Sequence, residues 1–278
     1  MSLTSASVKY WGLISALSLA GCSAVPGLED PTITFVPAVV LLDIEGNSSM
    51  QSPGGATPAN NGAVNLRDLG VGSRSSELGG HVRVGDGFSG LDVMFLNIDN
   101  NSARAGTATD DWGNLRSGDL VNARVEGNEY RLRYIAQTHD YTFETDREEI
   151  GVRFGGGGVL AHRDLKFQHR TTNGARTQAA TPRDNGVLYL AGRGQVTYGL
   201  YGLAADLAVS PYLNLGGDFE GMMWDLEVMA TYTLEDQDLT AYLGWRRSDL
   251  SASGSDSGFA YDLDLTMDGY FLGLELTF

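Results

Sequence analysis

Apolar and polar residues alternate with a period of two along most of residues 77–278, and polar segments interrupt the alternation at intervals. Successive side chains of a β-strand point to opposite faces, so this pattern predicts strands rather than helices. We therefore expect an all-β, antiparallel protein with eight strands near residues 77–98, 119–138, 147–167, 186–201, 206–217, 222–233, 238–249 and 260–278.

The clearest alternation lies in the last nine residues of the chain. One face of this strand is apolar, with an aromatic residue at each end: Tyr270, Leu272, Leu274, Leu276 and Phe278. The other face is formed by Phe271, Gly273, Glu275 and Thr277. An apolar face opposite a polar one is typical of a strand with lipid on one side and a polar lumen on the other. The pattern thus predicts a closed transmembrane β-barrel.

Charged side chains fall on the inward faces of several predicted strands. Applying the same alternation places these residues in the lumen: Arg131, Arg133, Glu149, Arg153, Arg193, Asp225, Glu227, Arg246 and Glu275. Eight strands leave a lumen that side chains can fill, and buried charges must pair or cost several kcal/mol each. We therefore expect an arginine–carboxylate network that plugs the barrel. The alternative is a narrow, charged channel.

Two irregularities affect the strand assignment. The apolar residues change phase near Gly127-Asn128 and near Asp268-Gly269, and a β-bulge at each glycine would supply the extra residue. Residues 85–87, Gly-Asp-Gly, could also form a hairpin turn that splits the first strand. Splitting it would give nine strands, whereas bacterial barrels prefer an even number. We therefore keep residues 77–98 as one long, kinked strand.

The connections between strands sort into two groups that alternate along the chain. Residues 99–118 and 168–185 are long and polar, whereas the connections near 139–146, 202–205 and 234–237 are short. Long loops on one side and short turns on the other are typical of outer-membrane barrels.

With its terminal aromatic strand and this alternation of loops, the chain resembles small bacterial outer-membrane barrels of the OmpA- and OmpW-like eight-stranded type over residues 77–278. The resemblance implies a location in the outer membrane of a Gram-negative bacterium. It implies a structural or surface-interaction role: membrane integrity, adhesion, or binding through the extracellular loops. The implied partners are outer-membrane lipid, lipopolysaccharide and the assembly machinery, which in that family reads the terminal strand. Two alternatives are a channel for ions or small hydrophobic solutes and a lipid-modifying enzyme.

The N-terminal region reads as an export signal followed by a tether. A short apolar run over residues 11–20 precedes Cys22, the single cysteine, and residues 19–22 read Leu-Ala-Gly-Cys. This ending resembles the lipobox of bacterial lipoprotein signals, which implies a signal peptide over 1–21 and lipidation of Cys22. An ordinary secretory signal cut after Ala24 is the alternative. Residues 22–76 are mostly irregular and predict a periplasmic tether. Within it, a short apolar patch over residues 33–42, broken by Pro37, could be an edge strand or a segment resting against the barrel or the membrane.

Composition excludes several classes of function. A formal charge of −16 argues against nucleic acid as a partner. The sequence contains no run of about 18 apolar residues, so it predicts no membrane-spanning helix. The four histidines match no metal-site spacing, and no nucleophile motif is present, so we expect neither a metal, a cofactor nor an enzyme.

Overall fold

The computed structural model describes residues 31–51, 63–72, 74–101, 104–211, 215–234 and 239–277. These residues form thirteen strands: β1 (Thr32–Gln51), β2 (Val64–Asn65), β3 (Ser75–Gly85), β4 (Gly90–Asn101), β5 (Gly106–Thr107), β6 (Leu120–Glu144), β7 (Glu149–Thr171), β8 (Thr177–Ala180), β9 (Val187–Tyr198), β10 (Tyr201–Pro211), β11 (Met222–Thr233), β12 (Leu239–Asp256) and β13 (Phe259–Thr277). No helix in the described ranges is long and apolar enough to cross a membrane.

Ten of the strands form a closed, hydrogen-bonded antiparallel ring. Its order is β1, β3, β4, β6, β7, β9, β10, β11, β12 and β13, and β13 pairs with β1. Following the residue pairing once around the ring from Gly151 of β7 leads back to β7 at Arg163, twelve residues further along. With ordinary strand spacings, this stagger tilts the strands by about 40° from the axis.

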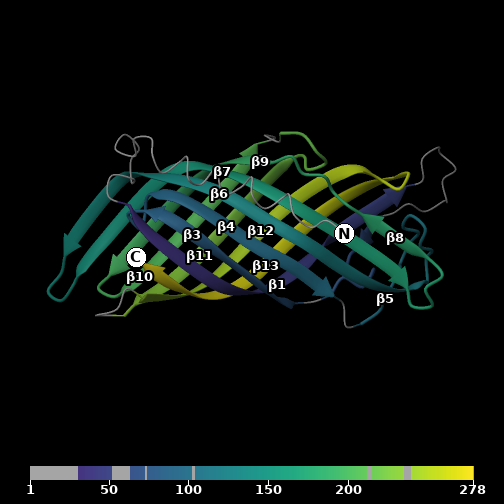
Figure 1. The fold of residues 1–278 in the computed structure, drawn as a ribbon, viewed down its shortest axis with the longest axis horizontal. Helices are drawn as coiled ribbons and strands as arrows, with labels where there is room; N and C mark the ends of the chain where they lie inside the picture. The colour runs from purple at the N-terminus through teal and green to yellow at the C-terminus, as the bar shows by residue number, and fades with distance from the viewer. Residues whose placement is uncertain are drawn as a thin grey trace, which may run out of the picture.

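The two ends of the ring differ. At one end, here called the terminal end, short connections follow β3, β6, β9 and β11, and β13 finishes there. At the other, the loop end, long connections carry the short strands β5 and β8, which lie together in Figure 1. The hairpin of β6 and β7 extends furthest at the terminal end (Figure 1).

The predicted all-β, antiparallel fold is confirmed, but the predicted number of eight strands is wrong. The turn at Gly85-Asp86-Gly87 does split the first predicted strand, into β3 and β4. The tenth strand of the ring is β1, which lies inside the segment predicted to be an irregular tether. Pro37 has no N–H to donate, and the pairing between β1 and β13 skips Val36 and Pro37. The strand nevertheless pairs with β13 on both sides of Pro37.

The change of phase along the strands is an inversion of environment, and no bulge causes it. On β13, Tyr270 and Leu272 are exposed on the outer face, whereas Leu265 and Met267 are buried inside. The pairing of β13 with β12 runs without interruption through Asp268-Gly269, and that of β6 with β7 through Gly127-Asn128. The predicted bulges are therefore wrong. Between β6 and β7 the register shifts instead between Gln137 and His139.

The inversion divides the molecule into two halves. In the terminal half, large apolar side chains face outward on all ten ring strands, for example Val39, Leu78, Phe95, Leu132, Leu160, Leu190, Leu203, Tyr232, Leu243 and Leu272. In the loop half, apolar side chains face inward and form one core, which includes Leu66, Leu69, Trp112, Leu115, Phe167, Phe219, Tyr261 and Leu263. Segments between the ring strands contribute to this core and fill the loop end of the ring.

A turn fills part of the lumen at the terminal end. Phe88, in the connection between β3 and β4, is 1 % exposed, and the guanidinium groups of Arg153 and Arg193 lie over its ring. Gly155 makes room for it, because a Cβ there would lie 2.8 Å from Phe88 Cε1. Gly155 thus lets the Phe88 side chain pack closely against the inner wall of β7.

Candidate functional site: the charged lumen

The lumen of the terminal half holds buried charged side chains at inward positions of at least seven ring strands. They form two groups, one toward the loop end and one toward the terminal end. We call them the loop-side cluster (Glu129, Arg131, Arg163, Asp225 and Arg246) and the terminal-side cluster (His81, Arg83, Asp92, Arg133, Arg193 and Asp206).

The loop-side cluster places three arginines around two carboxylates. Arg131 Nη2 lies 2.7 Å from Glu129 Oε1 and 2.6 Å from Asp225 Oδ2. Arg246 Nη2 donates to Glu129 Oε2 at 2.8 Å, and its Nε donates to Asp225 Oδ1 at 3.1 Å. Arg163 Nε lies 2.9 Å from Glu129 Oε1, a contact that is close enough for an ion pair but too poorly aligned for a hydrogen bond. Because Glu129 and Arg163 are fully buried, each depends on the others to offset its desolvation.

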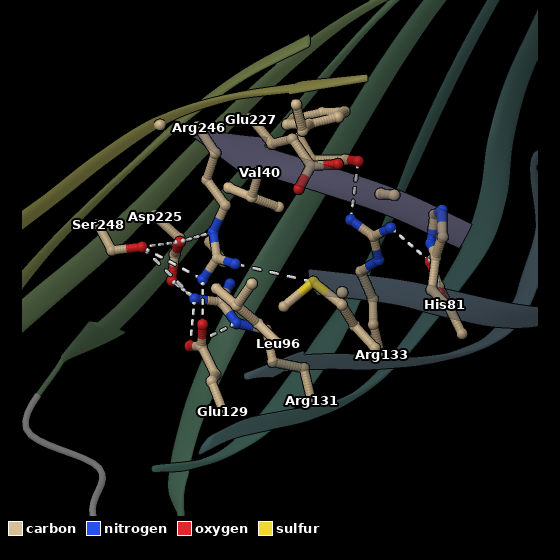
Figure 2. Close-up of a pocket in the computed structure, with 18 of the residues that line it drawn as sticks. Val40, His81, Leu96, Glu129, Arg131, Arg133, Asp225, Glu227, Arg246 and Ser248 are labelled. Atoms are coloured by element: carbon tan, nitrogen blue, oxygen red, sulfur yellow. Dashed lines mark hydrogen bonds and ion pairs between the residues drawn. The ribbon is translucent and has the colours of Figure 1, made fainter. Parts of the chain in front are cut away.

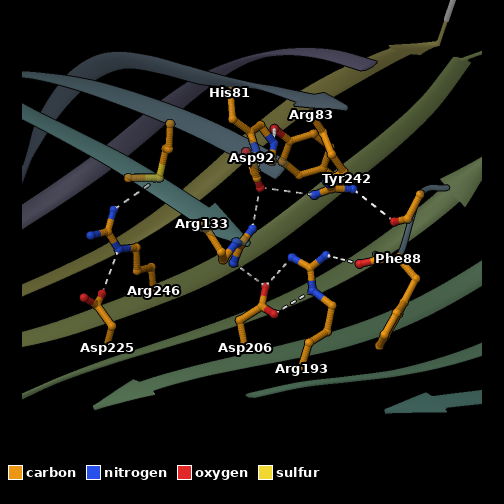
Figure 3. A network of polar contacts seen from close by, with 12 residues as sticks. His81, Arg83, Phe88, Asp92, Arg133, Arg193, Asp206, Asp225, Tyr242 and Arg246 are labelled. Carbon is orange, nitrogen blue, oxygen red and sulfur yellow. Dashed lines mark hydrogen bonds and ion pairs between the residues drawn. The ribbon is translucent and has the colours of Figure 1, made fainter. Parts of the chain in front are cut away.

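The terminal-side cluster is a chain of ion pairs across the lumen (Figure 3). Arg133 bridges two carboxylates, with Nη2 2.6 Å from Asp92 Oδ2 and Nη1 2.7 Å from Asp206 Oδ2. Arg193 binds Asp206 through both Nε and Nη2, at 2.7 and 2.9 Å. His81 Nδ1 lies 3.1 Å from Asp92, and Tyr242 Oη lies 3.3 Å from His81 Nε2. The chain ties β3, β4, β6, β9, β10 and β12 together across the lumen.

A cavity of about 90 Å³ separates the two clusters. Its lining combines charged groups of both clusters with apolar side chains, including Val40 and Leu96 (Figure 2). Met94, Met229 and Phe271 also line it. A second cavity, of about 240 Å³, lies at the terminal end, because Gly199, Tyr201 and Thr233 border it. We call it the terminal vestibule. Both cavities are lined by His81, Met229 and Tyr242, which therefore form a common wall between them.

Aromatic side chains packed over glycines support this wall. The Tyr242 ring lies where a side chain of Gly273 would be, with Cζ 2.5 Å from the position of a Cβ. Phe271 covers Gly244 in the same way, at 2.1 Å. The two rings contact each other edge to face, with centroids 5.7 Å apart. Each glycine thus allows an aromatic ring to lie flat against the inner wall of β12 and β13.

The predicted lumen residues have different environments in the structure. Arg131, Arg133, Arg193, Asp225 and Arg246 belong to the two clusters. Glu227 lines the cavity between them, and Arg153 and Glu275 line the terminal vestibule. Glu149 is exposed at the start of β7. Of the residues predicted as the assembly signal, Tyr270, Leu272, Leu274 and Leu276 are exposed on the outer face of β13. Phe278 and Cys22 lie outside the described residues.

The sequence interpretation missed two of the five residues of the loop-side cluster and four of the six residues of the terminal-side cluster. Asp92 and Asp206 lie in predicted strands, and the alternation alone could have placed them inside. Glu129 and Arg163 also lie in predicted strands, at positions in phase with Arg131 and Arg153, so the alternation could have placed them inside as well. Tyr189, at an inward position of β9, joins the loop-side cluster, because its hydroxyl accepts a hydrogen bond from Arg163 Nη1 at 2.9 Å.

Two titratable groups of the loop half have shifted pKa values. Burial lowers the pKa of His169 to about 3, and neither ring nitrogen has a hydrogen-bond partner. Burial raises the pKa of Tyr261, which also donates to Asp218 Oδ2 at 2.6 Å. No group of three or more His, Cys, Asp or Glu side chains within the described residues could hold a metal ion.

Comparison with known proteins identifies the fold. No family model matches the chain, and no curated protein matches its sequence. The outer membrane protease OmpT from Escherichia coli has a similar structure, with a TM-score of 0.51 at 10% identity, covering 93% of this chain and 100% of that one. A Pseudomonas aeruginosa FadL homologue (TM-score 0.34, 9% identity, 89% and 90% covered) and the P. putida toluene transporter TodX (0.32, 7%, 92% and 91%) also match. The chain shares the fold of outer-membrane β-barrel proteins.

This comparison corrects the prediction that the chain is not an enzyme. That prediction rested on the missing catalytic motifs, and it is contradicted by the similarity to a solved protease. At 10% identity the similarity shows the fold alone. The absence of a sequence motif is therefore no argument against catalysis in a barrel of this fold. The structural neighbours also do not favour the OmpA- and OmpW-like eight-stranded type.

Proposed function

We propose that this protein is an integral outer-membrane β-barrel of a Gram-negative bacterium, with a sealed lumen and a structural or surface-interaction role. The terminal end faces the periplasm and the loop end faces outward. The loop half then stands above the membrane, where its polar outer face meets water. Its partners are outer-membrane lipid and lipopolysaccharide around the wall, and the assembly machinery at β13.

The outward apolar side chains support the membrane location. They surround the ring, and an uninterrupted apolar band of this size in water would far exceed the few hundred Å² that soluble proteins expose. On β9 the band runs from Leu188 to Tyr198, which at a tilt of about 40° is roughly 25 Å along the axis. That height matches the apolar band of outer-membrane barrels.

The two charged clusters carry the proposal of a sealed lumen. They cross the lumen in succession, and above them lies the buried apolar core of the loop half. Purified protein in a planar lipid bilayer should therefore show no steady conductance. Arg133→Ala combined with Arg246→Ala removes one arginine from each cluster and should increase leak currents, whereas Arg124→Ala, on the outer face, should not. Steady conductance of the unmodified protein would instead favour the narrow channel.

A lipid anchor at Cys22 is a separate part of the proposal. It rests on the Leu-Ala-Gly-Cys ending of the signal segment. Cells grown with a labelled fatty acid should incorporate label into the protein, and Cys22→Ala should abolish incorporation. Unlabelled protein from cells expressing the natural sequence would leave an ordinary secretory signal as the explanation.

A further inference from the structure

The terminal vestibule collects polar side chains that form no hydrogen bond or ion pair with any other described residue. Its lining includes Arg153, Gln195, Thr197, Thr231 and Glu275. Arg83 and Arg193 also line it, but they bind Asp92 and Asp206. Arg153, Gln195, Thr197, Thr231 and Glu275 are therefore the side chains available to a ligand.

Arg153 supplies the free positive charge. Within the described residues its guanidinium forms no ion pair, and its interaction is with the face of Phe88, whose ring centre lies 5.3 Å from Cζ. A guanidinium stacked on a ring keeps its five N–H donors in its own plane, free to bind an oxyanion through two parallel hydrogen bonds. Asp140 is its neighbour in the pairing of β6 with β7, yet it does not reach the guanidinium.

Gln195 supplies an acceptor beside this donor. It is paired directly with Arg153 across β7 and β9, and its side-chain oxygen is buried without a hydrogen-bond partner. An unsatisfied buried acceptor is costly, so a ligand that carries a proton on oxygen would be favoured there. The hydroxyls of Thr197 and Thr231 add further groups, and each occupies space left by a glycine, Gly151 and Gly202.

We propose that the terminal vestibule binds hydrogen phosphate, free or as a phosphate monoester. Near neutral pH, hydrogen phosphate has acceptor oxygens for Arg153 and the threonine hydroxyls, and one P–OH that can donate to Gln195. Sulfate has the same shape and charge but no proton to donate. The site needs only the vestibule, so it does not depend on whether the lumen above it is sealed.

The test uses the full-length protein in detergent micelles at pH 7.5, titrated by calorimetry with inorganic phosphate and, separately, with sodium sulfate. Phosphate should bind, and sulfate should bind at least about tenfold more weakly, because the Gln195 oxygen is left unpaired. Arg153→Gln should weaken phosphate binding by about tenfold or more. Arg170→Gln, on the exposed face of the same strand, should leave it unchanged. Glu275→Gln should strengthen it, because a like charge is removed from the lining.

Several results would overturn the proposal. Absence of phosphate binding to the natural protein would refute the site, and equal affinities for phosphate and sulfate would refute the role of Gln195. Unchanged affinity in Arg153→Gln would place any binding elsewhere. Folding of each variant is checked by heat-modifiable migration on gels. Phosphate and glycerol phosphate, compared in the same titration, distinguish the free ion from the monoester.

Discussion

Replacing Glu129 by glutamine should severely destabilise the barrel. Its carboxylate oxygens lie 2.7 Å from Arg131 Nη2, 2.9 Å from Arg163 Nε and 2.8 Å from Arg246 Nη2. Glutamine keeps the volume but removes the charge, so the three arginines share only Asp225. Removing one partner of a buried ion pair costs about 3–5 kcal/mol. We expect a loss of that size, because Glu129 and Arg163 are both fully buried.

The same strand offers a matched control, Glu126→Gln. The Glu126 side chain is 31% exposed on the outer face, and its carboxylate lies 3.2 Å from Arg124 and 3.8 Å from Lys166. An exposed ion pair of this kind contributes about 1 kcal/mol or less. The free energy of unfolding is measured by urea titration in lipid vesicles, followed by tryptophan fluorescence. If Glu129→Gln cost no more than Glu126→Gln, the clusters would not hold the lumen together.

Two further predictions concern the loop half and the inner wall. Burial holds the pKa of His169 at about 3 in the folded protein, whereas a histidine of the unfolded chain has a pKa of about 6.5. Below pH 6.5 the unfolded chain binds a proton that the folded protein does not, so the free energy of unfolding falls as the pH is lowered from 6.5 toward 3. Acidification from about pH 6.5 to 4.5 should therefore cost up to about 2.7 kcal/mol through this residue, and His169→Phe should flatten the unfolding free energy over that range. Gly155→Ala should destabilise by about 1–3 kcal/mol, because its Cβ would lie 2.7 Å from Ala136 O and 2.8 Å from Phe88 Cε1. At Gly156 the nearest atom would be 3.6 Å away, so Gly156→Ala should be tolerated; equal melting temperatures for the two variants would contradict the packing of Phe88.

The sequence predicts most of the ring strands, but neither their number nor the closed ring of ten. The alternation over Tyr270–Leu276 predicts the outer face of β13 as the structure has it, because lipid-facing side chains must be apolar at every second position. It did not settle β1, because Pro37 interrupts the short apolar patch there and leaves an edge strand as only one of the alternatives. It also could not reveal that the apolar residues of one strand change face, because period-two patterning looks the same for a bulge and for a change of surroundings.

The contacts in the clusters could not be predicted either. Arg246 and Arg131 were expected inside, but a contact such as Arg246 to Glu129 joins residues 117 positions apart. The carboxylate that each arginine contacts depends on the stagger of the whole ring. An error in the predicted number of strands therefore changes the ion-pair partners across the lumen. An eight-stranded prediction could therefore assign inward faces correctly and still assign no ion pair.

The inversion explains why the charges lie where they do. A strand that exposes apolar side chains to lipid can place only its alternate residues inside, and those residues must fill the lumen of a ten-stranded ring. Arginine and carboxylate side chains are long enough to meet across that space, and they satisfy one another there. Above the apolar band the outer face meets water, so the same alternation can place apolar residues inside and build an ordinary core. The ring is thus stabilised in two ways, by ion pairs behind its apolar outer band and by apolar packing in the loop half.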